Sequence, residues 1–245
     1  GQTGHGVRED FPGPTKLQLK QKVLKLALGL EHTIAIMEDR TLWAWGQGAS
    51  GQLGTGKPRP QLTPTQITTL TGGVEDCSAG EDHSCAVMQS GELYTWGSAD
   101  CGKLGHGTSM TTGQQMLPRQ VRVSHIVVQV EAGAQHTACL SVQRRLFTFG
   151  AGWFGRLGLG NDANQYNPEP MAVPSNLQVR DFRVGDYHTC IVTTNDELWI
   201  CGRDHVCLAE DHVNTPMKFD SFDEEVRVAE VATAGQFVMV LSTKG

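Results

Sequence analysis

The chain repeats one short pattern, and this repetition constrains its fold more than any other feature of the sequence. Four copies read Gly-x-x-His-Thr/Ser and begin at Gly29, Gly80, Gly133 and Gly185, and a degenerate fifth copy begins at Gly235. Successive copies are separated by 51, 53, 52 and 50 residues. Such a period is typical of proteins that stack one supersecondary unit many times, because a single unit cannot bury its own apolar face.

Each copy also has a fixed inner spacing. The distance from the histidine to the glycine that closes the next strand is 14 residues in all four copies. That glycine ends an aromatic segment, such as Leu-Trp-Ala-Trp-Gly at residues 42–46, and a Gly-x-Leu-Gly loop begins five residues later in the first three copies. In the fourth copy this loop has decayed to Val206-Cys-Leu-Ala. The histidines are His32, His83, His136 and His188.

The unit has the pattern of β-structure. Residues 32–37 form a short apolar strand, residues 38–40 a polar turn and residues 41–45 an aromatic strand. A proline-bearing segment follows, and then a β-branched stretch such as residues 126–130 leads into the next copy. About four strands in each unit of 50-odd residues make one blade of a β-propeller. We therefore expect an all-β propeller of four-stranded blades, with four clear repeats and a partial fifth.

With these motifs the chain resembles the repeat of the regulator of chromosome condensation family, over about residues 23–242. The resemblance implies a propeller, and members of this family commonly close seven blades. At the observed spacing, 245 residues are too few for seven. We expect an N-terminal tail at residues 1–22 and a propeller at residues 23–245. The propeller is either an unusually small ring or a piece of a larger one, and we favour the piece.

The repeated residues suit packing roles. The glycines of Gly-x-Leu-Gly permit positive φ, and the leucine is expected to fill the space between blades. Packing between blades is also the preferred role of the aromatic residues, with an exposed binding platform as the alternative. The four histidines could form a ring of metal ligands, but hydrogen bonding to an adjacent loop is the simpler interpretation. The aromatic residues in question are Trp43, Trp45, Trp96, Phe149 and Trp199.

Motifs of catalysis and cofactor binding are weak. Gly-x-Gly-x-x-Gly occurs at residues 46–51 and 150–155, but prolines follow where a dinucleotide site needs a helix. A phosphate-loop pattern at residues 51–57 has Pro58 in place of the Ser or Thr that would bind Mg²⁺. We expect no catalytic residue, no cofactor and no metal site. One further cluster has an uncommon zinc spacing: Cys201, His205, Cys207 and His212.

The net charge and the cysteine content limit the kinds of partner and the cellular location that we expect. The formal net charge is −6, so a broad nucleic-acid-binding surface is not expected. There is no run of 18 apolar residues and no signal-peptide pattern, which predicts neither a membrane span nor secretion. The seven cysteines are interpreted as reduced thiols, which indicates an intracellular location without distinguishing nucleus from cytoplasm.

Two functions compete. The resemblance implies either a non-catalytic protein-interaction module, perhaps within a larger protein, or guanine-nucleotide exchange on a Ran-type small GTPase. Exchange would need an inserted wedge, and the even spacing leaves no room for one, so we favour the module. The Gly-x-x-His loops are expected to share one face and to bind a basic protein partner. The alternative surfaces are the loops at the opposite end of the blades and the acidic stretch around residues 220–225. The candidate partner-binding residues are Glu31, Glu81, Asp82 and Asp186.

Overall fold

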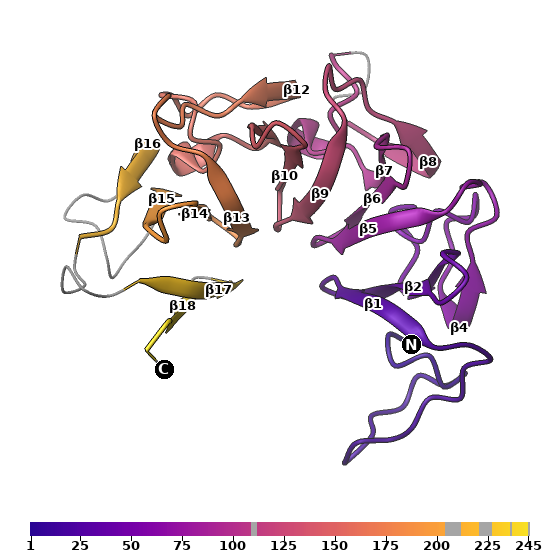
Figure 1. Ribbon diagram of the computed structural model, residues 1–245. Coiled ribbons are helices and arrows are strands. Elements are labelled where there is room, and N and C mark those ends of the chain that lie inside the picture. The colour runs from indigo at the N-terminus through magenta and orange to yellow at the C-terminus, as the bar shows by residue number, and fades with distance from the viewer. Residues whose placement is uncertain (109–111, 204–211, 221–226, 236, 245) are drawn as a thin grey trace.

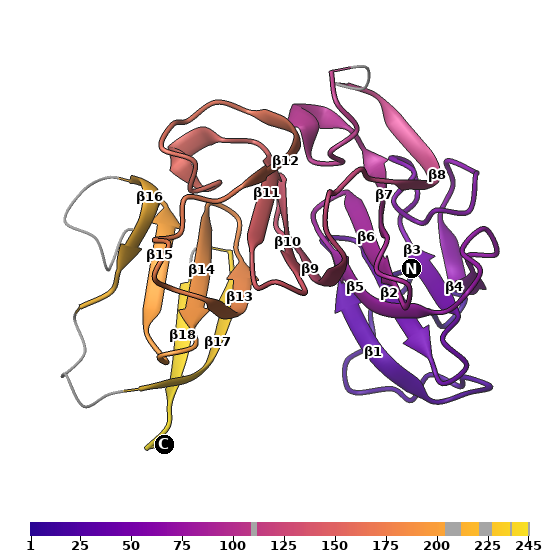
Figure 2. The ribbon, with the colours of Figure 1, turned by 45° about the horizontal axis from the view of Figure 1, so that its top comes forward.

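The computed structural model describes residues 1–108, 112–203, 212–220, 227–235 and 237–244. In these residues the secondary structure consists of 18 β-strands and two short 3-10 turns. The strands form five antiparallel sheets, four with four strands and one with two. The sheets stand side by side around a common axis (Figure 1), and the view in Figure 2 shows the strands of each sheet running along that axis. The predicted all-β propeller architecture is confirmed.

Each complete blade is an up-and-down meander whose first strand lies nearest the axis. We number the blades 1 to 5 along the chain, and the fifth comprises only its two inner strands in the described residues. Blade 1 contains β1 (Val23–Leu28), β2 (His32–Met37), β3 (Leu42–Gly46) and β4 (Gln61–Gln66). Blade 2 contains β5 (Val74–Ala79), β6 (His83–Met88), β7 (Leu93–Ser98), η1 (Asp100–Gly102) and β8 (Gln114–Gln120). Blade 3 contains β9 (Val127–Ala132), β10 (His136–Ser141), β11 (Leu146–Gly150), η2 (Trp153–Gly155) and β12 (Gln165–Pro170). Blade 4 contains β13 (Val179–Val184), β14 (His188–Thr193), β15 (Leu198–Gly202) and β16 (Val213–Lys218), and blade 5 contains β17 (Val228–Ala234) and β18 (Phe237–Ser242).

The register of the central hairpin explains the constant spacing of 14 residues. In blade 1, His32 at the start of the second strand pairs with Gly46 at the end of the third, and the same pairing recurs in blades 2, 3 and 4. Gly46 has a φ of 105°, and a Cβ atom there would lie 2.5 Å from the carbonyl oxygen of Glu31. Only glycine fits this position, because its backbone is left-handed and another loop crosses directly over it.

The Gly-x-Leu-Gly loops lock each blade to the next one. Their leucines, Leu53, Leu104 and Leu157, are fully buried, as the sequence predicted. The indole of Trp96 donates a hydrogen bond of 2.9 Å from Nε1 to the carbonyl of Gln52 in the loop of the preceding blade. A Cβ atom on Gly54 would lie 2.8 Å from the same nitrogen, so this glycine allows the ring to approach.

The aromatic residues divide into two groups. Trp96 and Phe149 are buried between blades, which confirms the packing interpretation for them. Trp45 is buried as well, but against the N-terminal residues Leu17 and Leu19. Trp43 and Trp199 are half-buried. Trp199 packs against the core between blades 3 and 4, whereas Trp43 packs within the cluster of Trp45 in blade 1. Trp43 and Trp45 are two residues apart on one strand, so they point to the same face, where both pack with Leu17 and Leu19.

The described residues form an open ring, with a wide gap between β18 and the N-terminal side of blade 1 (Figure 1). On both sides of the gap, apolar side chains of the strands are exposed. Leu26 of β1 is 51% exposed, although the residues in the same register in blades 2 to 4 are at most 1% exposed. Met239 of β18 is 72% exposed, although its counterparts in blades 1 to 4 are all at 0%. Both faces therefore resemble blade-packing faces without a neighbouring blade.

Residues 1–6 pack against blade 1 in the way that a Gly-x-Leu-Gly loop packs against the following blade. The carbonyl of Gln2 accepts hydrogen bonds from Thr33 Oγ1 at 3.1 Å and from Trp45 Nε1 at 2.8 Å. The carbonyl of Gln52 accepts the equivalent bonds from Ser84 and Trp96 in blade 2. The domain boundary after residue 22 stays a prediction, but these contacts indicate that the repeat pattern extends upstream of it.

Candidate partner-binding rim

The Gly-x-x-His loops lie at the same end of every blade, because each joins the first strand of a blade to its second. We call the loops at residues 29–31, 80–82, 133–135 and 185–187 the rim. Together with residues of β17 and Gly235 they line a cavity of about 480 Å³ at the axis. The sequence predicted that these loops share one face, and the strand order places them so.

One set of backbone hydrogen bonds holds the rim in shape. The residue before each histidine offers its carbonyl to the amide that follows the strand-closing glycine, as in Gln47 N to Glu31 O at 2.8 Å and Arg203 N to Tyr187 O at 2.9 Å. The side chains at this position differ from blade to blade: Glu31, Asp82, Gln135 and Tyr187. The rim is thus a fixed scaffold that presents varied side chains.

The repeated histidines link neighbouring blades. Nε2 of His32 lies 2.8 Å from the hydroxyl of Ser84 in blade 2, and that hydroxyl donates to the carbonyl of Gln52 at 2.8 Å. His83 with Thr137 and His136 with Thr189 repeat the arrangement at 2.9 and 3.1 Å. We expected the histidines to bond directly to an adjacent loop; they bond to it through a hydroxyl of the next blade.

This geometry fixes the protonation of the imidazoles. Because the hydroxyl hydrogen of Ser84 is committed to a carbonyl, Nε2 of His32 must be the donor. Nδ1 of His32 is then an acceptor, and it is buried without a hydrogen-bond partner among the described residues. Burial lowers the pKa of His32 to about 4, and it lowers the pKa values of His83 and His136 well below the usual value. These rings are neutral structural groups at physiological pH.

The structure brings together two of the four predicted acidic residues. Glu81 and Asp186 line the axial cavity, whereas Glu31 and Asp82 do not. Glu31 is exposed, and Glu81 accepts a hydrogen bond of 2.5 Å from Nε2 of Gln135. Asp82 accepts one of 2.6 Å from Lys103 Nζ, so its charge is neutralised inside the molecule. The acidic character of the rim thus rests on Glu31, Glu81 and Asp186.

Sequence reasoning missed the cations of the rim. Lys103 and Arg156 occupy the variable position of Gly-x-Leu-Gly in blades 2 and 3, and neither has any exposed surface. Lys103 donates to both Asp82 of its own blade and Oε1 of Gln135 in the next blade. Arg156 donates from Nη1 to the carbonyl of Asp186 at 2.8 Å. The signal was present in the sequence, because a Lys or Arg inside an otherwise apolar loop needs a partner when it is buried.

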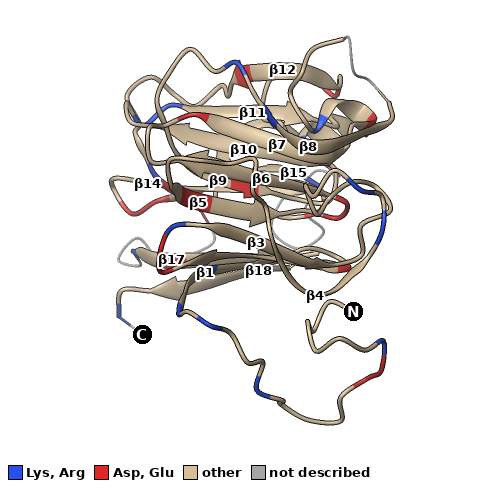
Figure 3. Cartoon of the chain, turned by 90° about the vertical axis from the view of Figure 1, so that its right-hand side faces the viewer, with Lys and Arg blue, Asp and Glu red and all other residues tan. Residues whose placement is uncertain are grey.

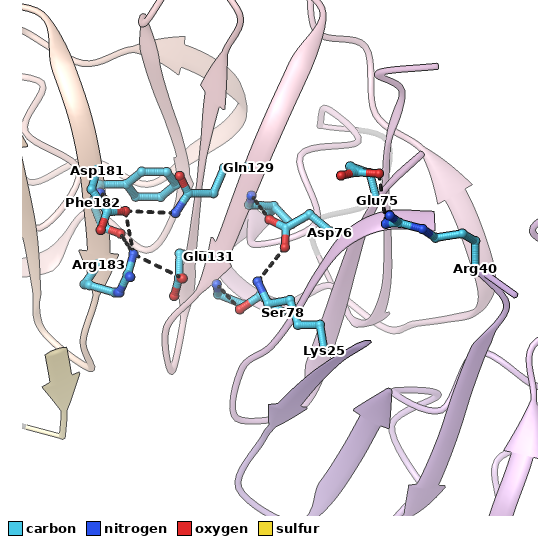
Figure 4. Close-up of polar contacts among 12 residues, drawn as sticks. Lys25, Arg40, Glu75, Asp76, Ser78, Gln129, Glu131, Asp181, Phe182 and Arg183 are labelled. Atoms are coloured by element: carbon cyan, nitrogen blue, oxygen red, sulfur yellow. Dashed lines mark hydrogen bonds and ion pairs between the residues drawn. The ribbon is translucent and has the colours of Figure 1, made fainter. Parts of the chain in front are cut away.

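A second polar network joins the blades nearer the middle of the axis (Figure 4). Lys25 pairs with Asp76, and the other carboxylate oxygen of Asp76 accepts the amide of Val130 at 2.8 Å. In blade 4, Arg183 pairs with Asp181 of its own strand at 2.6 Å, and it lies 3.8 Å from Glu131 of blade 3. Burial raises the pKa of Glu131 to about 7. The contacts of Lys25 with Asp76, Asp76 with Val130 and Arg183 with Glu131 therefore connect blades 1 to 4 in sequence.

The described residues contain no cluster of three or more His, Cys, Asp or Glu side chains suited to a metal ion, and no helix among them could span a membrane. Of the possible zinc cluster, His205 and Cys207 lie outside the described residues, as does the decayed loop beginning at Val206. Most of the alternative acidic stretch, residues 221–225, lies outside them as well. Figure 3 colours acidic and basic residues on the backbone, and the two kinds are interspersed along the strands and loops in view.

Comparison with known proteins identifies the repeat. A sequence model described as the regulator of chromosome condensation (RCC1) repeat matches residues 39–87, 90–140 and 145–192, and a second model of the same description matches residues 23–52, 74–103 and 179–206. The chain is 33% identical over 209 residues to the ultraviolet-B receptor UVR8 of Arabidopsis thaliana. The alignment covers 83% of this chain and 47% of the receptor. It is 31% identical over 256 aligned positions to the human E3 ubiquitin-protein ligase HERC2. This alignment covers all of this chain and 5% of the ligase.

Solved structures show the same fold. Human WBSCR16 superposes with a TM-score of 0.84 at 22% identity, covering 99% of this chain and 65% of that protein. Prp20p of Saccharomyces cerevisiae, studied for its binding to Gsp1p and histones, superposes with a TM-score of 0.81 at 20% identity, covering 92% of this chain and 57% of that protein. The chain thus spans less than two thirds of the length of each of these four proteins.

Proposed function

Since the chain belongs to the family of regulator of chromosome condensation (RCC1) repeats, we propose that it is a non-catalytic protein-interaction module that binds a basic protein partner through its rim. The observation that carries the proposal is the contrast between a constant backbone and varied side chains. The same carbonyl-to-amide bonds fix the loops of blades 1 to 4, while the position before the histidine changes from Glu to Asp, Gln and Tyr. Varied loops on a rigid scaffold are the usual arrangement of a binding surface.

The negative charge of the rim supports a basic partner. Glu31, Glu81 and Asp186 have no Lys or Arg within ion-pair distance among the described residues, whereas Asp82 is paired with Lys103. Unpaired surface charge steers an oppositely charged partner and raises its association rate more than its final affinity. The structure of Prp20p was studied together with its binding to histones, which are basic proteins. A dimer of core histones is therefore a suitable probe.

The test is the association rate with that histone dimer at low salt, measured by stopped-flow fluorescence. We expect the triple variant Glu31→Lys, Glu81→Lys, Asp186→Lys to associate at least tenfold more slowly and with a weaker salt dependence. A control variant reverses three exposed acidic residues outside the rim, Asp10→Lys, Glu38→Lys and Glu169→Lys, and keeps the same net charge. Equal rates for the rim variant and the wild type, or an equal loss in the control, would refute the rim as the binding face.

Guanine-nucleotide exchange on a Ran-type small GTPase is the second candidate, because Prp20p is described with Gsp1p. The loops of blades 1 to 4 that the structure describes contain no long insertion that could act as a wedge, which favours the module. Release of a fluorescent GDP analogue from a Ran-type GTPase separates the two functions. The module should leave the release rate unchanged, and a saturable acceleration would establish exchange instead.

A further inference from the structure

A second cavity lies on the axis, one level deeper than the cavity of the rim. Its volume is about 330 Å³. The two cavities share one lining residue from each blade, so they form a continuous space that is entered from the rim. The shared residues are Leu28, Ala79, Ala132, Val184 and Thr233.

The deeper cavity is lined by the same position of the first strand in every blade. In blade 3 this position is Glu131, which pairs in register with Ala138, and equivalent pairs define the position in the other blades. Alanine or serine occupies it in blades 1, 2 and 5, so the fold does not require a carboxylate there. The five residues are Ala27, Ser78, Glu131, Arg183 and Ala232, and all of them line the cavity.

The carboxylate of Glu131 can be reached from the rim. Its side chain is 22% exposed, and Glu131 stands two residues before Gly133 of the rim. Two residues of a strand span about 7 Å, a distance that an extended Lys or Arg side chain can cross. Glu81 and Asp186 line the outer part of the same space. A cation that enters from the rim therefore meets negative charge at the entrance and again at Glu131.

The charges around the cavity leave Glu131 with an incomplete ion pair. Lys25 pairs with Asp76, and Arg183 donates to Asp181 at 2.6 Å but lies 3.8 Å from Glu131 (Figure 4). No hydrogen bond from the described residues reaches the carboxylate of Glu131, and the strands beside β9, which are β5, β10 and β13, are described over their whole length. With Glu131 ionised, two cations thus face three carboxylates.

We propose that the axial cavity receives a Lys or Arg side chain of a protein partner docked on the rim, and that this side chain forms an ion pair with Glu131. The proposal rests on the rim being the partner-binding face and names the residue type that enters it. Lys and Arg form strong, charge-assisted hydrogen bonds with carboxylates. Such a side chain would lie at the centre of the interface, where the residues that dominate binding energy cluster.

The cavity disfavours an anion, although Lys25 and Arg183 line it. Each of these cations already contacts a carboxylate, Asp76 for Lys25 and Asp181 for Arg183. An acidic ligand would have to displace these contacts and would also lie close to the negative charge of Glu131. A cationic side chain needs neither change, because it completes the pairing of Glu131.

The experiment is a differential selection followed by a double-mutant cycle. A displayed library of random peptides is depleted on Glu131→Gln and then selected on the wild-type chain at pH 8, and affinities are measured by fluorescence anisotropy. We expect the enriched peptides to share a Lys or Arg whose replacement by Gln lowers the affinity at least tenfold. In Glu131→Gln the same replacement should lower it less than twofold, because the pairing partner is already gone. The matched control is Glu75→Gln, which removes an exposed carboxylate outside the cavity and should leave the affinity unchanged.

The pH dependence distinguishes an ion pair from a change of shape. The charged groups that face Glu131 are Lys25 of β1, Asp76 of β5, and Asp181 and Arg183 of β13. Burial raises the pKa of Glu131 to about 7, and a cation binds its ionised form. Affinity for an enriched peptide should therefore rise severalfold from pH 6 to pH 8 in the wild type and change little in Glu131→Gln.

Three results would overturn the proposal: no enriched peptide, enriched peptides without a shared Lys or Arg, or additive losses in the double-mutant cycle. Enrichment of acidic peptides would assign the cavity to an anion held by Lys25 and Arg183 instead. The selection does not use the histone dimer, so its outcome is independent of histone binding. Histone association that is slowed in the triple rim variant but unchanged in Glu131→Gln would leave the rim function standing without the axial site.

Discussion

At the scale of single residues, the histidines show how a repeated motif can suggest a metal site and serve packing instead. His32, His83 and His136 each use Nε2 to reach a hydroxyl of the next blade, and each is buried as a neutral ring. The glycine that opens each motif belongs to the same arrangement. A Cβ atom on Gly29 would lie 2.2 Å from the imidazole of His32, so the anchor of the repeat must be glycine.

The buried histidines predict that the chain loses stability in mild acid. Their pKa values are lower in the folded state than in the unfolded chain, so their stabilising contribution is complete above pH 6.5. It is lost as the pH falls from 6.5 toward 4, because the unfolded chain takes up protons first. Urea unfolding at pH 7.5 and pH 5 should show the loss, with each histidine contributing up to about 1.4 kcal/mol per pH unit.

The variant His32→Gln keeps a donor for Ser84 and removes the titration. Its unfolding free energy should depend less steeply on pH than that of the wild type over the same interval. Parallel pH profiles for the two proteins would show that His32 does not titrate as the structure requires.

At the scale of the elements, neighbouring strands are held together by links that no single repeat contains. Lys25 with Asp76, Lys103 with Gln135 and Arg183 with Glu131 all cross from one blade to the next. The sequence predicted the hairpins, because the spacing of 14 residues between histidine and glycine is the hairpin register itself. It could not predict these pairs, because the partners lie far apart in the sequence and are joined only when the blades pack.

The sequence also failed to predict the ion pair of Asp82 at the rim and the loop formed by residues 1–6. Asp82 was predicted to be an unpaired acidic residue, but in the folded chain it forms an ion pair with Lys103. Residues 1–6 have the sequence Gly-Gln-Thr-Gly-His-Gly and lack the leucine of Gly-x-Leu-Gly, so the motif was not recognised. Their glycines nevertheless occupy the loop geometry, with φ of 77° at Gly4 and 66° at its counterpart Gly54.

Glu131 on β9 provides a prediction at this scale. Burial raises its pKa to about 7, above its unfolded value, so its contribution to stability is complete below pH 4.5 and is lost as the pH rises through 7. Glu131→Gln should therefore be more stable than the wild type at pH 8, by about 1–3 kcal/mol, and the difference should vanish toward pH 4.5. Denaturant unfolding at the two pH values tests it.

The control for Glu131 is Glu75→Gln, which removes an exposed carboxylate paired with Arg40. This variant should change the unfolding free energy by less than about 1 kcal/mol at either pH. A Glu131→Gln protein that is less stable than the wild type at pH 8 would show that the ion pair with Arg183 outweighs the cost of burying the charge.

At the scale of the whole molecule, the open ring explains which apolar residues are exposed. Leu140 in blade 3 and Leu241 in blade 5 occupy the same register position, yet Leu140 is fully buried and Leu241 is 51% exposed. The difference is the neighbouring blade, which covers Leu140 and is absent beside β18 in the described residues. Further repeats packed on these two faces would complete the pattern, which supports the prediction of a piece of a larger propeller.

Substituting alanine for each of these two leucines measures how much the neighbouring blade contributes to stability. Leu140→Ala should lower the unfolding free energy of the chain by about 2–5 kcal/mol, the usual cost of removing a buried leucine side chain. Leu241→Ala should lower it by less than about 1 kcal/mol, because its side chain already contacts water. Similar losses for both variants in chemical denaturation would mean that the face of β18 is covered in solution.

The central claim is that the rim is the face that binds the partner, and hydrogen–deuterium exchange of the complex tests it most directly. With the core histone dimer bound, we expect slower exchange in the loops at residues 29–31, 80–82, 133–135 and 185–187. The turns at the opposite end of the blades, at residues 38–41, 89–92, 142–145 and 194–197, should exchange as in the free chain. Protection confined to those turns, or to the apolar faces of β1 and β18, would contradict the claim.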